Sequence, residues 1–444
     1  MAESAVAGAL HAAESVIGGA VALVKGIAHP TLPLKSKLLP ITSVPLPRSH
    51  HTISVVKGRA YIFGGESSAG QLADNAMQIV ILPSSGVLEA DYTSIPARGR
   101  EVPAPRKRHT ATVIGDSIYI FGGEGVAPEK GRIWVYSTIS NDWSHIDPPS
   151  PDAPYPAHRS GHATASSDKP GPKDVTYQEK APQQPADPAE VVPEPADADT
   201  WGTIFIVGGR DILNGQLLND GLAFDLNTRT WSNIPTPAGP AREGASMTLL
   251  GNRLYRYGGK GVETFASGAL QFVDVSQVWN HAKSGTTPLV SGWAWEEVLH
   301  PDGRSAPPAR SNAGLVAVTT GQGRHYLLVI GGEGEGAGAT FLDDIWTFQL
   351  PPEYATAAVV GDQVRASISK STHVGEWAET SYAHVDDTGV EKEIPGQPKR
   401  GLGARGGFAV DKGSEVDGAS VVAWGGVDEG GRVLGDGWLV TVER

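Results

Sequence analysis

A short apolar segment that ends in two consecutive glycines occurs six times along the chain. β-Branched and aromatic residues precede each glycine pair, as in AYIFGG ending at Gly65 and IYIFGG ending at Gly123. The other copies are IFIVGG, LYRYGG, LLVIGG and VVAWGG, which end at Gly209, Gly259, Gly332 and Gly426. A motif that recurs along a chain indicates a repeat architecture in which each copy is one supersecondary unit. The sequence therefore predicts six similar units.

Other positions keep the same register. An arginine precedes the first strand of each unit: Arg48, Arg106, Arg159, Arg242, Arg310 and Arg405. After each glycine pair come a variable loop, a third strand such as RIWVYST, and in most units a fourth strand that opens on Tyr92, Trp143, Trp231, Trp295 or Trp377. A four-stranded sheet buries both faces only against neighbouring sheets, and a closed ring leaves only short edges. The fold class predicted is all-β, a six-bladed β-propeller, with the tryptophans in its core.

The double glycine, the upstream arginine and the downstream tryptophan resemble the kelch repeat over residues 36–444. The chain resembles bare kelch propellers such as the nitrile-specifier-type proteins, but it lacks their iron motif Glu-x-x-x-Asp-x-x-x-His. Among kelch enzymes, galactose oxidase needs a cysteine joined to a tyrosine, and this chain has no cysteine. The resemblance therefore implies the fold without these metal chemistries, and we expect no cofactor and no metal.

The sixth unit ends after its third strand, so its fourth strand has to come from elsewhere. Residues 36–44 occupy the position that a fourth strand takes ahead of the other arginines. We expect this N-terminal strand to complete the last blade and to close the ring.

Residues 1–30 are predicted to form an amphipathic helix. Apolar residues recur at steps of three and four: Val6, Leu10, Ala13, Ile17, Val21 and Val24. The helix either docks on its own domain or binds a partner or a membrane surface. The uncharged run inside it is about half the roughly 20 residues that a membrane-spanning helix needs, and its start is not basic as in a signal peptide.

Two insertions interrupt the repeat. Residues 166–200, within blade 3, are rich in proline and acidic residues and predict a disordered loop. Residues 351–400 lie between blades 5 and 6, carry Trp377 as the fourth strand of blade 5, and otherwise predict a surface excursion.

Charge and cysteine content narrow the function classes. The formal net charge is −13, which argues against binding nucleic-acid phosphates. The absence of cysteine excludes disulfides and thiolate chemistry. We expect a cytoplasmic protein without a transmembrane segment.

In kelch propellers the arginine loops and the loops after the double glycine open on one face, around the central channel. The resemblance therefore implies a polar rim around the channel. The predicted binding residues on this rim are His50, His51, Glu66, Arg108, Glu124, Arg210, Asp211, Lys260, Glu333 and Asp428. Glu243 and Asn312 also belong to the rim. Such a rim can bind a charged partner through charge-assisted hydrogen bonds. The six repeat arginines are interpreted as structural, tying turn carbonyls or a carboxylate of the adjacent blade.

The leading hypothesis is a non-catalytic interaction module that binds a protein partner through this loop face. The alternative is a small-molecule enzyme, a cyclase, isomerase or lyase, that works in the channel mouth with His50, His51, Arg108 or Glu124. A carbohydrate-binding role is a third hypothesis. The single Gly-x-Gly-x-x-Gly, at residues 401–406, precedes a strand rather than a helix, so we interpret it as a turn and not as a dinucleotide site.

Overall fold

A computed structural model describes most of residues 30–443. The residues outside the description are 1–29, 42–44, 84–91, 151, 172–200, 282–291, 299–304, 321–322, 336–339, 353–355, 369–370, 387–388, 392–400, 414–418 and 444. The predicted helix of residues 1–30 and most of the predicted acidic loop of residues 166–200 therefore lie outside the described residues.

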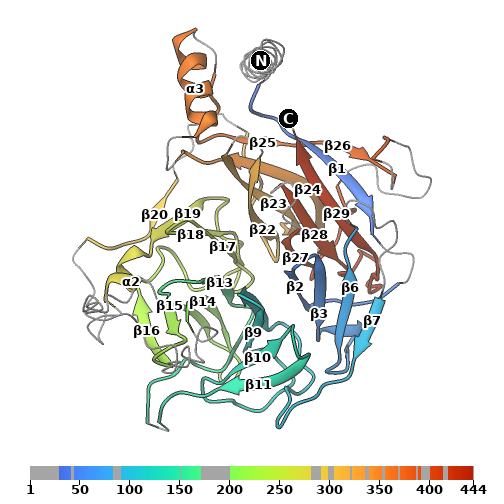
Figure 1. The fold of residues 1–444 in the computed structure, drawn as a ribbon, viewed down its shortest axis with the longest axis vertical. Coiled ribbons are helices and arrows are strands. Elements are labelled where there is room, and N and C mark those ends of the chain that lie inside the picture. The colour runs from blue at the N-terminus through green and yellow to red at the C-terminus, as the bar shows by residue number, and fades with distance from the viewer. Residues whose placement is uncertain are drawn as a thin grey trace, which may run out of the picture.

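Six β-sheets stand like blades around a central axis (Figure 1), as the repeat predicts. From the axis outward, blade 1 contains β2 (Thr52–Val56), β3 (Arg59–Phe63), β6 (Met77–Ile81) and β7 (Tyr92–Ile95), and blade 2 contains β8 (Thr110–Ile114), β9 (Ser117–Phe121), β10 (Ile133–Ser137) and β11 (Asp142–Ile146). Blade 3 contains β13 (Ala163–Ser167), β14 (Thr203–Asp211), β15 (Leu217–Asp225) and β16 (Thr230–Ile234), and blade 4 contains β17 (Ser246–Leu250), β18 (Arg253–Tyr257), β19 (Leu270–Asp274) and β20 (Glu296–Glu297). Blade 5 contains β22 (Gly314–Thr320), β23 (Arg324–Gly334), β24 (Thr340–Gln349) and β25 (Trp377–Glu379), and blade 6 contains β27 (Ala409–Lys412), β28 (Ser420–Trp424), β29 (Gly437–Glu443) and β1 (Lys35–Pro40).

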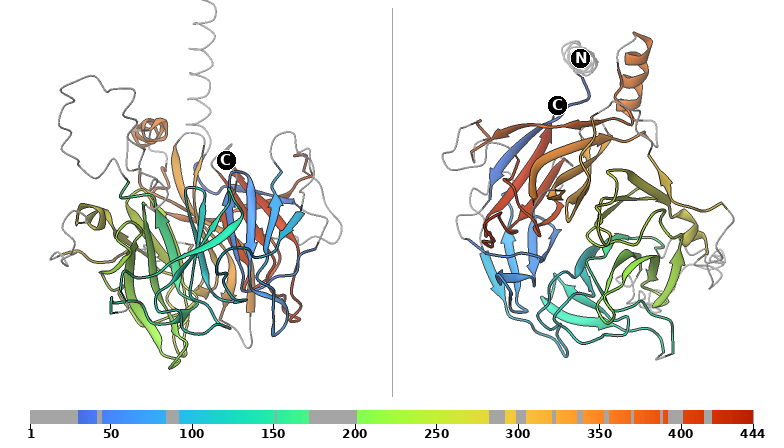
Figure 2. Two further views of the ribbon diagram at one scale, coloured as in Figure 1. Left: turned by 60° about the horizontal axis from the view of Figure 1, so that its bottom comes forward. Right: turned by 180° about the vertical axis from the view of Figure 1, so that it is seen from behind.

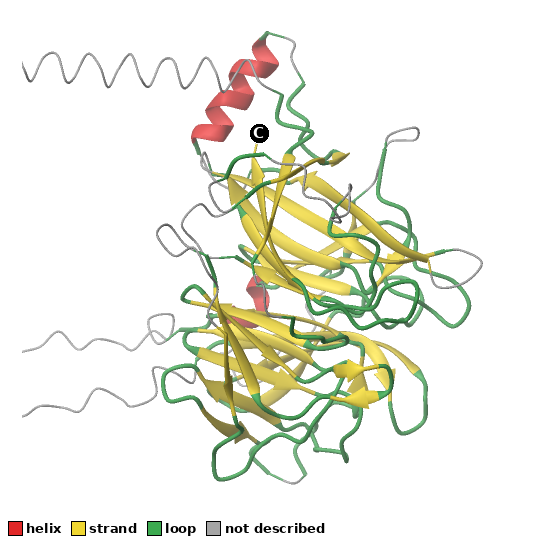
Figure 3. Cartoon of the chain, turned by 90° about the vertical axis from the view of Figure 1, so that its right-hand side faces the viewer, coloured by secondary structure: helices red, strands yellow, loops and turns green. Residues whose placement is uncertain are grey.

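Short elements accompany the blades. β12 (Arg159–Ser160) and β21 (Arg310–Ser311) pair with the ends of β14 and β23, and β4 (Glu66–Ser68) with β5 (Gln71–Leu72) forms a small hairpin. The helix α2 (Ser276–His281) follows β19. Figure 3 shows how strands dominate the molecule and how the helix α3 (Ala357–Ser367) stands outside the ring.

The core lies between the blades. Apolar side chains from both faces of each sheet pack against the next blade, as Phe63 of blade 1 does against Trp143 of blade 2 with ring centroids 5.0 Å apart. Trp143, Trp231, Trp295 and Trp377 are buried, in agreement with the prediction, whereas Tyr92 is exposed. Because each blade contributes two apolar faces, the ring is held by packing between blades.

The N-terminal strand closes the ring. β1 pairs antiparallel with β29 from Lys35 opposite Glu443 to Pro40 opposite Trp438, and Leu38 is fully buried. Figure 2 shows these two strands, blue and red, side by side. The prediction of closure by residues 36–44 is confirmed, with the strand itself ending at Pro40.

The insertion of residues 351–400 contributes more than a surface excursion. Trp377 begins β25, the fourth strand of blade 5, as predicted. Immediately afterwards β26 (Ser381–His384) pairs in parallel with β1 and extends blade 6 to five strands. The sequence did not predict this pairing, because β26 is short and pairs with residues more than 340 positions away.

The repeat arginines are structural, and four of the six pair with a carboxylate that lies in the same blade and not in the adjacent one. Arg242 instead donates to the side-chain oxygen of Gln271 and Arg48 to the Pro47 carbonyl. Arg106 donates from Nη1 to the carbonyl of Gly122 at 3.0 Å and pairs with both carboxylate oxygens of Glu129 at 2.9 and 2.7 Å. Arg159, Arg310 and Arg405 repeat this geometry with Asp220, Asp344 and Asp436. The adjacent blade is tied through the main chain, because the carbonyl of Arg106 accepts the Gly65 N–H at 2.8 Å. Each repeat arginine of this kind thus fixes the loops of its own blade through its side chain and holds the neighbouring blade through its main-chain carbonyl.

Candidate functional site

The mouth of the channel is lined by the residue two positions after each repeat arginine: His50, Arg108, Gly161, Gly244, Asn312 and Gly407. All six have a left-handed backbone, with φ between 51° and 65°. Five of their N–H groups donate to the carbonyl of the corresponding residue in the preceding blade, at 2.6 to 3.0 Å. The result is a belt of main-chain hydrogen bonds around the mouth, which fixes the position of each side chain that it carries.

Three of the six positions carry side chains, and these lie over the three glycines. A Cβ atom on Gly161 would stand 2.8 Å from Nη2 of Arg108, and one on Gly407 would stand 2.9 Å from Nε2 of His50. A Cβ atom on Gly244 would likewise stand 2.7 Å from Oδ1 of Asn312. Glycine is needed here both for the positive φ and for the space, since a side chain is strained in this conformation. His50, Arg108 and Asn312 adopt it at a cost, which is common at functional sites.

Ion pairs link loops of four blades around this mouth. The Arg108 guanidinium donates to Oε2 of Glu243 at 2.6 Å across the space above Gly161, and its Nε lies 3.6 Å from Glu124. Arg210 donates to Oε1 of the same Glu243 at 2.6 Å. We call this set, together with the pair between Lys107 and Glu66 at 2.6 Å, the mouth network.

The mouth network is electrically balanced, with three basic and three acidic side chains. Burial raises the pKa of Glu243, but hydrogen bonds from Arg210 and Arg108 outweigh it, and the net shift is downward. At His50, burial and the neighbouring Arg108 lower the pKa. The mouth therefore carries its charges in paired form at neutral pH and presents neutral His50 beside them.

The other predicted rim residues lie in the same loops but have local roles. Asp211 and Asp428 accept main-chain N–H groups within their own turns, from Leu213 and from Gly430 and Arg432. Glu333 accepts from the Asn312 amide at 2.9 Å. Lys260 lies over the ring of Phe265 at 5.2 Å.

His51, predicted at the rim, is buried below the mouth. Its counterparts His109 and His162 lie three residues after their repeat arginines, and each joins a threonine hydroxyl of the preceding blade, Thr52 at 2.9 Å and Thr110 at 2.7 Å. Blade 6 has Ala409 where these threonines stand, so His51 has no hydrogen-bond partner among the described residues. Burial lowers the pKa of His51 and of His162 to about 3. These histidines are neutral packing elements.

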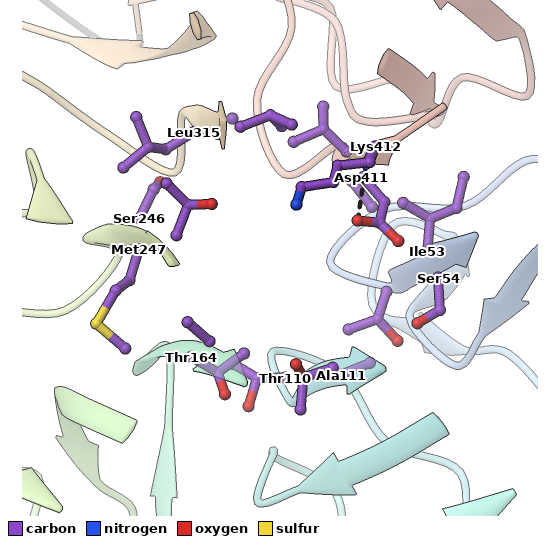
Figure 4. Close-up of a pocket in the computed structure, with 18 of the residues that line it drawn as sticks. Ile53, Ser54, Thr110, Ala111, Thr164, Ser246, Met247, Leu315, Asp411 and Lys412 are labelled. Carbon is purple, nitrogen blue, oxygen red and sulfur yellow. Dashed lines mark hydrogen bonds between the residues drawn. The ribbon is translucent and has the colours of Figure 1, made fainter. Parts of the chain in front are cut away.

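Behind the mouth runs a channel of about 1410 Å³, walled by the first strand of every blade (Figure 4). Its hydroxyl groups mostly bond to neighbouring blades: Thr112 donates to Ser166 at 2.5 Å, Ser166 to the Val113 carbonyl at 2.9 Å, and Ser246 to the Ala313 carbonyl. At the far end Asp411 accepts the Val55 N–H at 2.7 Å, and enclosure by the channel wall raises its pKa to about 6. The wall is thus used for contacts between blades.

Sequence reasoning missed two features of the loop face. Lys107, directly after a repeat arginine, completes the mouth network, and its pairing partner is visible only in three dimensions. Leu213 and Val262, at the tips of the loops that follow the glycine pairs of blades 3 and 4, are 69% and 85% exposed. Apolar residues in otherwise polar loops were the signal that could have found them.

No group of three histidine, aspartate or glutamate side chains that could hold a metal occurs among the residues whose placement is described. The Gly-x-Gly-x-x-Gly of residues 401–406 precedes β27 and contains Arg405, so it forms the arginine loop of blade 6. In the described part of the chain, no helix has the length and apolar character needed to cross a membrane.

Comparison with known proteins agrees with this architecture. The family model of the KLHDC2/KLHL20/DRC7 kelch-repeats domain matches residues 34–170, and the kelch motif matches residues 202–238. Kelch domain-containing protein 3 of Bos taurus is 26% identical over 48% of this chain and 48% of its own length. N-(sulfonatooxy)prop-2-enimidothioate sulfolyase of Thlaspi arvense is 31% identical over 23% of this chain and 28% of its own length.

The chain spans half or less of the length of these relatives. The solved structure of YjhT matches with a TM-score of 0.53 and 15% identity, covering 91% of this chain and 99% of that one, which shows a shared fold. Six blades, their buried arginines and these family matches together show that the chain is a kelch-repeat β-propeller protein.

Proposed function

We propose that this propeller is a protein-interaction module that binds a partner protein through the loop face around the channel mouth. The observation that carries the proposal is the combination of a rigid, charge-balanced mouth network with two exposed apolar loop tips, Leu213 and Val262. Protein interfaces have this composition, with apolar anchors surrounded by polar groups. The binding residues in this proposal are those of the predicted rim except the buried His51, together with Lys107, Glu243 and the two tips.

The enzyme alternative has less support. A catalytic centre needs polar groups that converge on a free space where a substrate can react. Here Arg108 and Glu124 are engaged in ion pairs, His51 is buried, and His50 packs over Gly407. The sulfolyase of Thlaspi arvense is a reason to test the alternative, because its name describes an enzyme.

The test is capture of the tagged full-length chain from its native cells, with quantitative identification of bound proteins and metabolites. Variants Leu213→Asp and Val262→Asp alter the loop face, whereas Ile139→Asp, a residue 74% exposed in the turn between β10 and β11, alters the opposite end and is the matched control.

We expect one or more proteins to be lost from both loop-face variants and retained by the control. A protein retained by all three variants would move the interface away from this face. Recovery of a metabolite without any protein would favour the enzyme.

The proposal also places the protein in the cytoplasm. A chain with no cysteine gains nothing from an oxidising compartment, and its net charge of −13 does not favour nucleic acid as the partner. Imaging of the fluorescently tagged full-length chain tests this location.

A further inference from the structure

The helix α3 carries an apolar stripe whose two ends are exposed and whose middle residue, Val364, is half-buried. Val360, Val364 and Ile368 follow one another at steps of four along the helix and its C-cap, so they share one side. Val360 is 52% exposed and Ile368 51% exposed. We call these three residues the α3 stripe.

The opposite side of α3 holds the helix to blade 5. Asp362 accepts a hydrogen bond from Arg324 at the start of β23, and Arg365 is 2% exposed. At 100° per residue, Asp362 points away from the α3 stripe and Arg365 lies at the flank of the stripe. The stripe is therefore not the surface by which α3 docks on the propeller, and Figure 1 shows α3 outside the ring of blades.

The N-terminal segment joins the described structure beside this helix. Thr31 donates from its hydroxyl to the Thr372 carbonyl at 3.0 Å, in the segment that returns from α3. The carbonyl of Thr31 accepts from the Tyr326 hydroxyl at 3.0 Å, two residues from the arginine that anchors α3. Residues 1–29 are thus attached to the molecule directly beside α3.

We propose that residues 1–29 form a helix that packs along the α3 stripe of the same molecule. Their own sequence has the matching feature, an apolar stripe of Val6, Leu10, Ala13, Ile17, Val21 and Val24. At a rise of about 1.5 Å per residue, this stripe is longer than the α3 stripe and can cover all of it. The short tether at Thr31 gives the segment an effective concentration in the millimolar range, which favours it over a second copy of the chain.

The anchor points favour one direction. Tyr326, which donates to the Thr31 carbonyl, lies near Asp362 and Arg365 in the middle and second half of α3. Thr31 also donates to the Thr372 carbonyl, four residues after Ile368. A helix that leaves from Thr31 and runs back toward Met1 is therefore expected to pass Ile368 before Val360, with Val21 and Val24 in reach of Ile368.

Engineered disulfides test this arrangement, and the absence of native cysteine makes every bond formed unambiguous. The test variants of the full chain combine Ile368→Cys with Val21→Cys or with Val24→Cys. The control combines Ile368→Cys with Ala22→Cys, which has nearly the same tether length but lies on the opposite side of the predicted helix. Mild oxidation is followed by mass analysis under non-reducing conditions.

We expect an intramolecular disulfide in at least one test variant, formed at least tenfold faster than in the control. Equal rates would overturn the proposal, since a segment without a preferred face brings all three positions to Ile368 equally. Disulfide-linked dimers would also overturn it, by assigning the stripe to a second copy.

A measurement without substitutions gives an independent result. We expect amide hydrogen exchange in residues 357–367 to be at least tenfold slower in the full chain than in a chain that lacks residues 1–29. Unchanged exchange would contradict the proposal. Both tests are independent of what binds at the channel mouth.

Discussion

Three arginines of this chain illustrate how position decides the role of one residue type. Arg106 is fully buried and pairs with Glu129, Arg108 holds a left-handed backbone at the mouth, and Arg256 is 1% exposed. Arg256 lies at a β18 position where other blades have Ile62, Ile120 or Ile206, and its guanidinium has no hydrogen-bond partner among the described residues. Burial lowers the pKa of Arg256 to about 9, which still leaves it charged at neutral pH.

Replacing Arg256 by isoleucine is therefore expected to stabilise the protein. A buried charge without a partner costs more than an apolar group that packs well. Even buried ion pairs, whose charges have partners, have been replaced by apolar residues with gains in stability of about 1–4 kcal/mol, and we expect a gain in this range. Urea unfolding monitored by tryptophan fluorescence measures the change. Arg106→Ile is the control, and we expect it to lose up to about 3–5 kcal/mol because it leaves the half-buried Glu129 carboxylate without its arginine, with Trp134 as its remaining hydrogen-bond donor in the described part of the chain. A loss of stability in Arg256→Ile would contradict this expectation and would show that the Arg256 guanidinium makes a stabilising contact in the folded protein.

Gly161 lies directly below the Arg108 guanidinium, so a side chain at this position should lower stability. Gly161→Ala is expected to lower stability by about 1–3 kcal/mol, because the added Cβ meets both an unfavourable φ and the Arg108 guanidinium. Gly115→Ala is the matched control, since Gly115 has a φ of 59° against 58° for Gly161 but open space around it. The difference between the two in chemical denaturation isolates the collision with Arg108. Equal losses would mean that the ion pair of Arg108 with Glu243 moves aside freely.

At the scale of elements, the first strand of each blade both lines the channel and contacts the neighbouring blade. The histidines at the start of blades 1, 2 and 3 are part of this contact, since each lies against the first glycine of the preceding blade's glycine pair. All three have a pKa lowered mainly by burial, His51 and His162 to about 3.

These histidines predict sensitivity to acid. In the unfolded chain each titrates near pH 6.5, whereas in the folded protein it stays neutral far below that value. The unfolded state therefore binds more protons, and stability falls as the pH drops from about 6.5 toward 3. Thermal unfolding across this range should show the loss, and His51→Phe should reduce it, since Phe408 stands at the same position in blade 6. An unchanged pH profile in this variant would mean that His51 does not contribute to the acid response.

At the scale of the whole molecule, closure of the ring joins the two ends of the chain in one sheet. β1 covers the outer edge of β29 and buries Leu38 in the cluster that also contains Trp438 and Val440. Without β1, the edge of β29 and part of this cluster would meet water.

Removing residues 1–41 is consequently expected to destabilise the entire propeller, not blade 6 alone. An unprotected edge strand also invites association, so the shortened chain should aggregate. The control is removal of residues 1–29, which leaves β1 in place. Denaturant unfolding and light scattering measure both effects, and equal stability of the two shortened chains would show that closure by β1 is dispensable.

Much of the fold could be predicted from sequence because it depends on local, repeated features. The double glycines, the arginines and the alternating apolar strands each determine the structure of a few neighbouring residues, and repetition six times leaves a closed ring as the way to bury every face. Even the N-terminal closing strand followed from this reasoning, because the sixth unit lacked a fourth strand.

The sequence by itself thus determined the architecture, the structural role of the repeat arginines and the loops from which the rim is built. Only the tertiary structure decided which of the rim residues meet: Arg108 reaches Glu243 two blades away because Gly161 between them has no side chain. It also decided that His51 is buried, that β26 joins blade 6, and that Thr31 lies beside α3. The physical reason is distance along the chain, since contacts between residues tens to hundreds of positions apart depend on how whole blades pack and leave no periodic signal in the sequence.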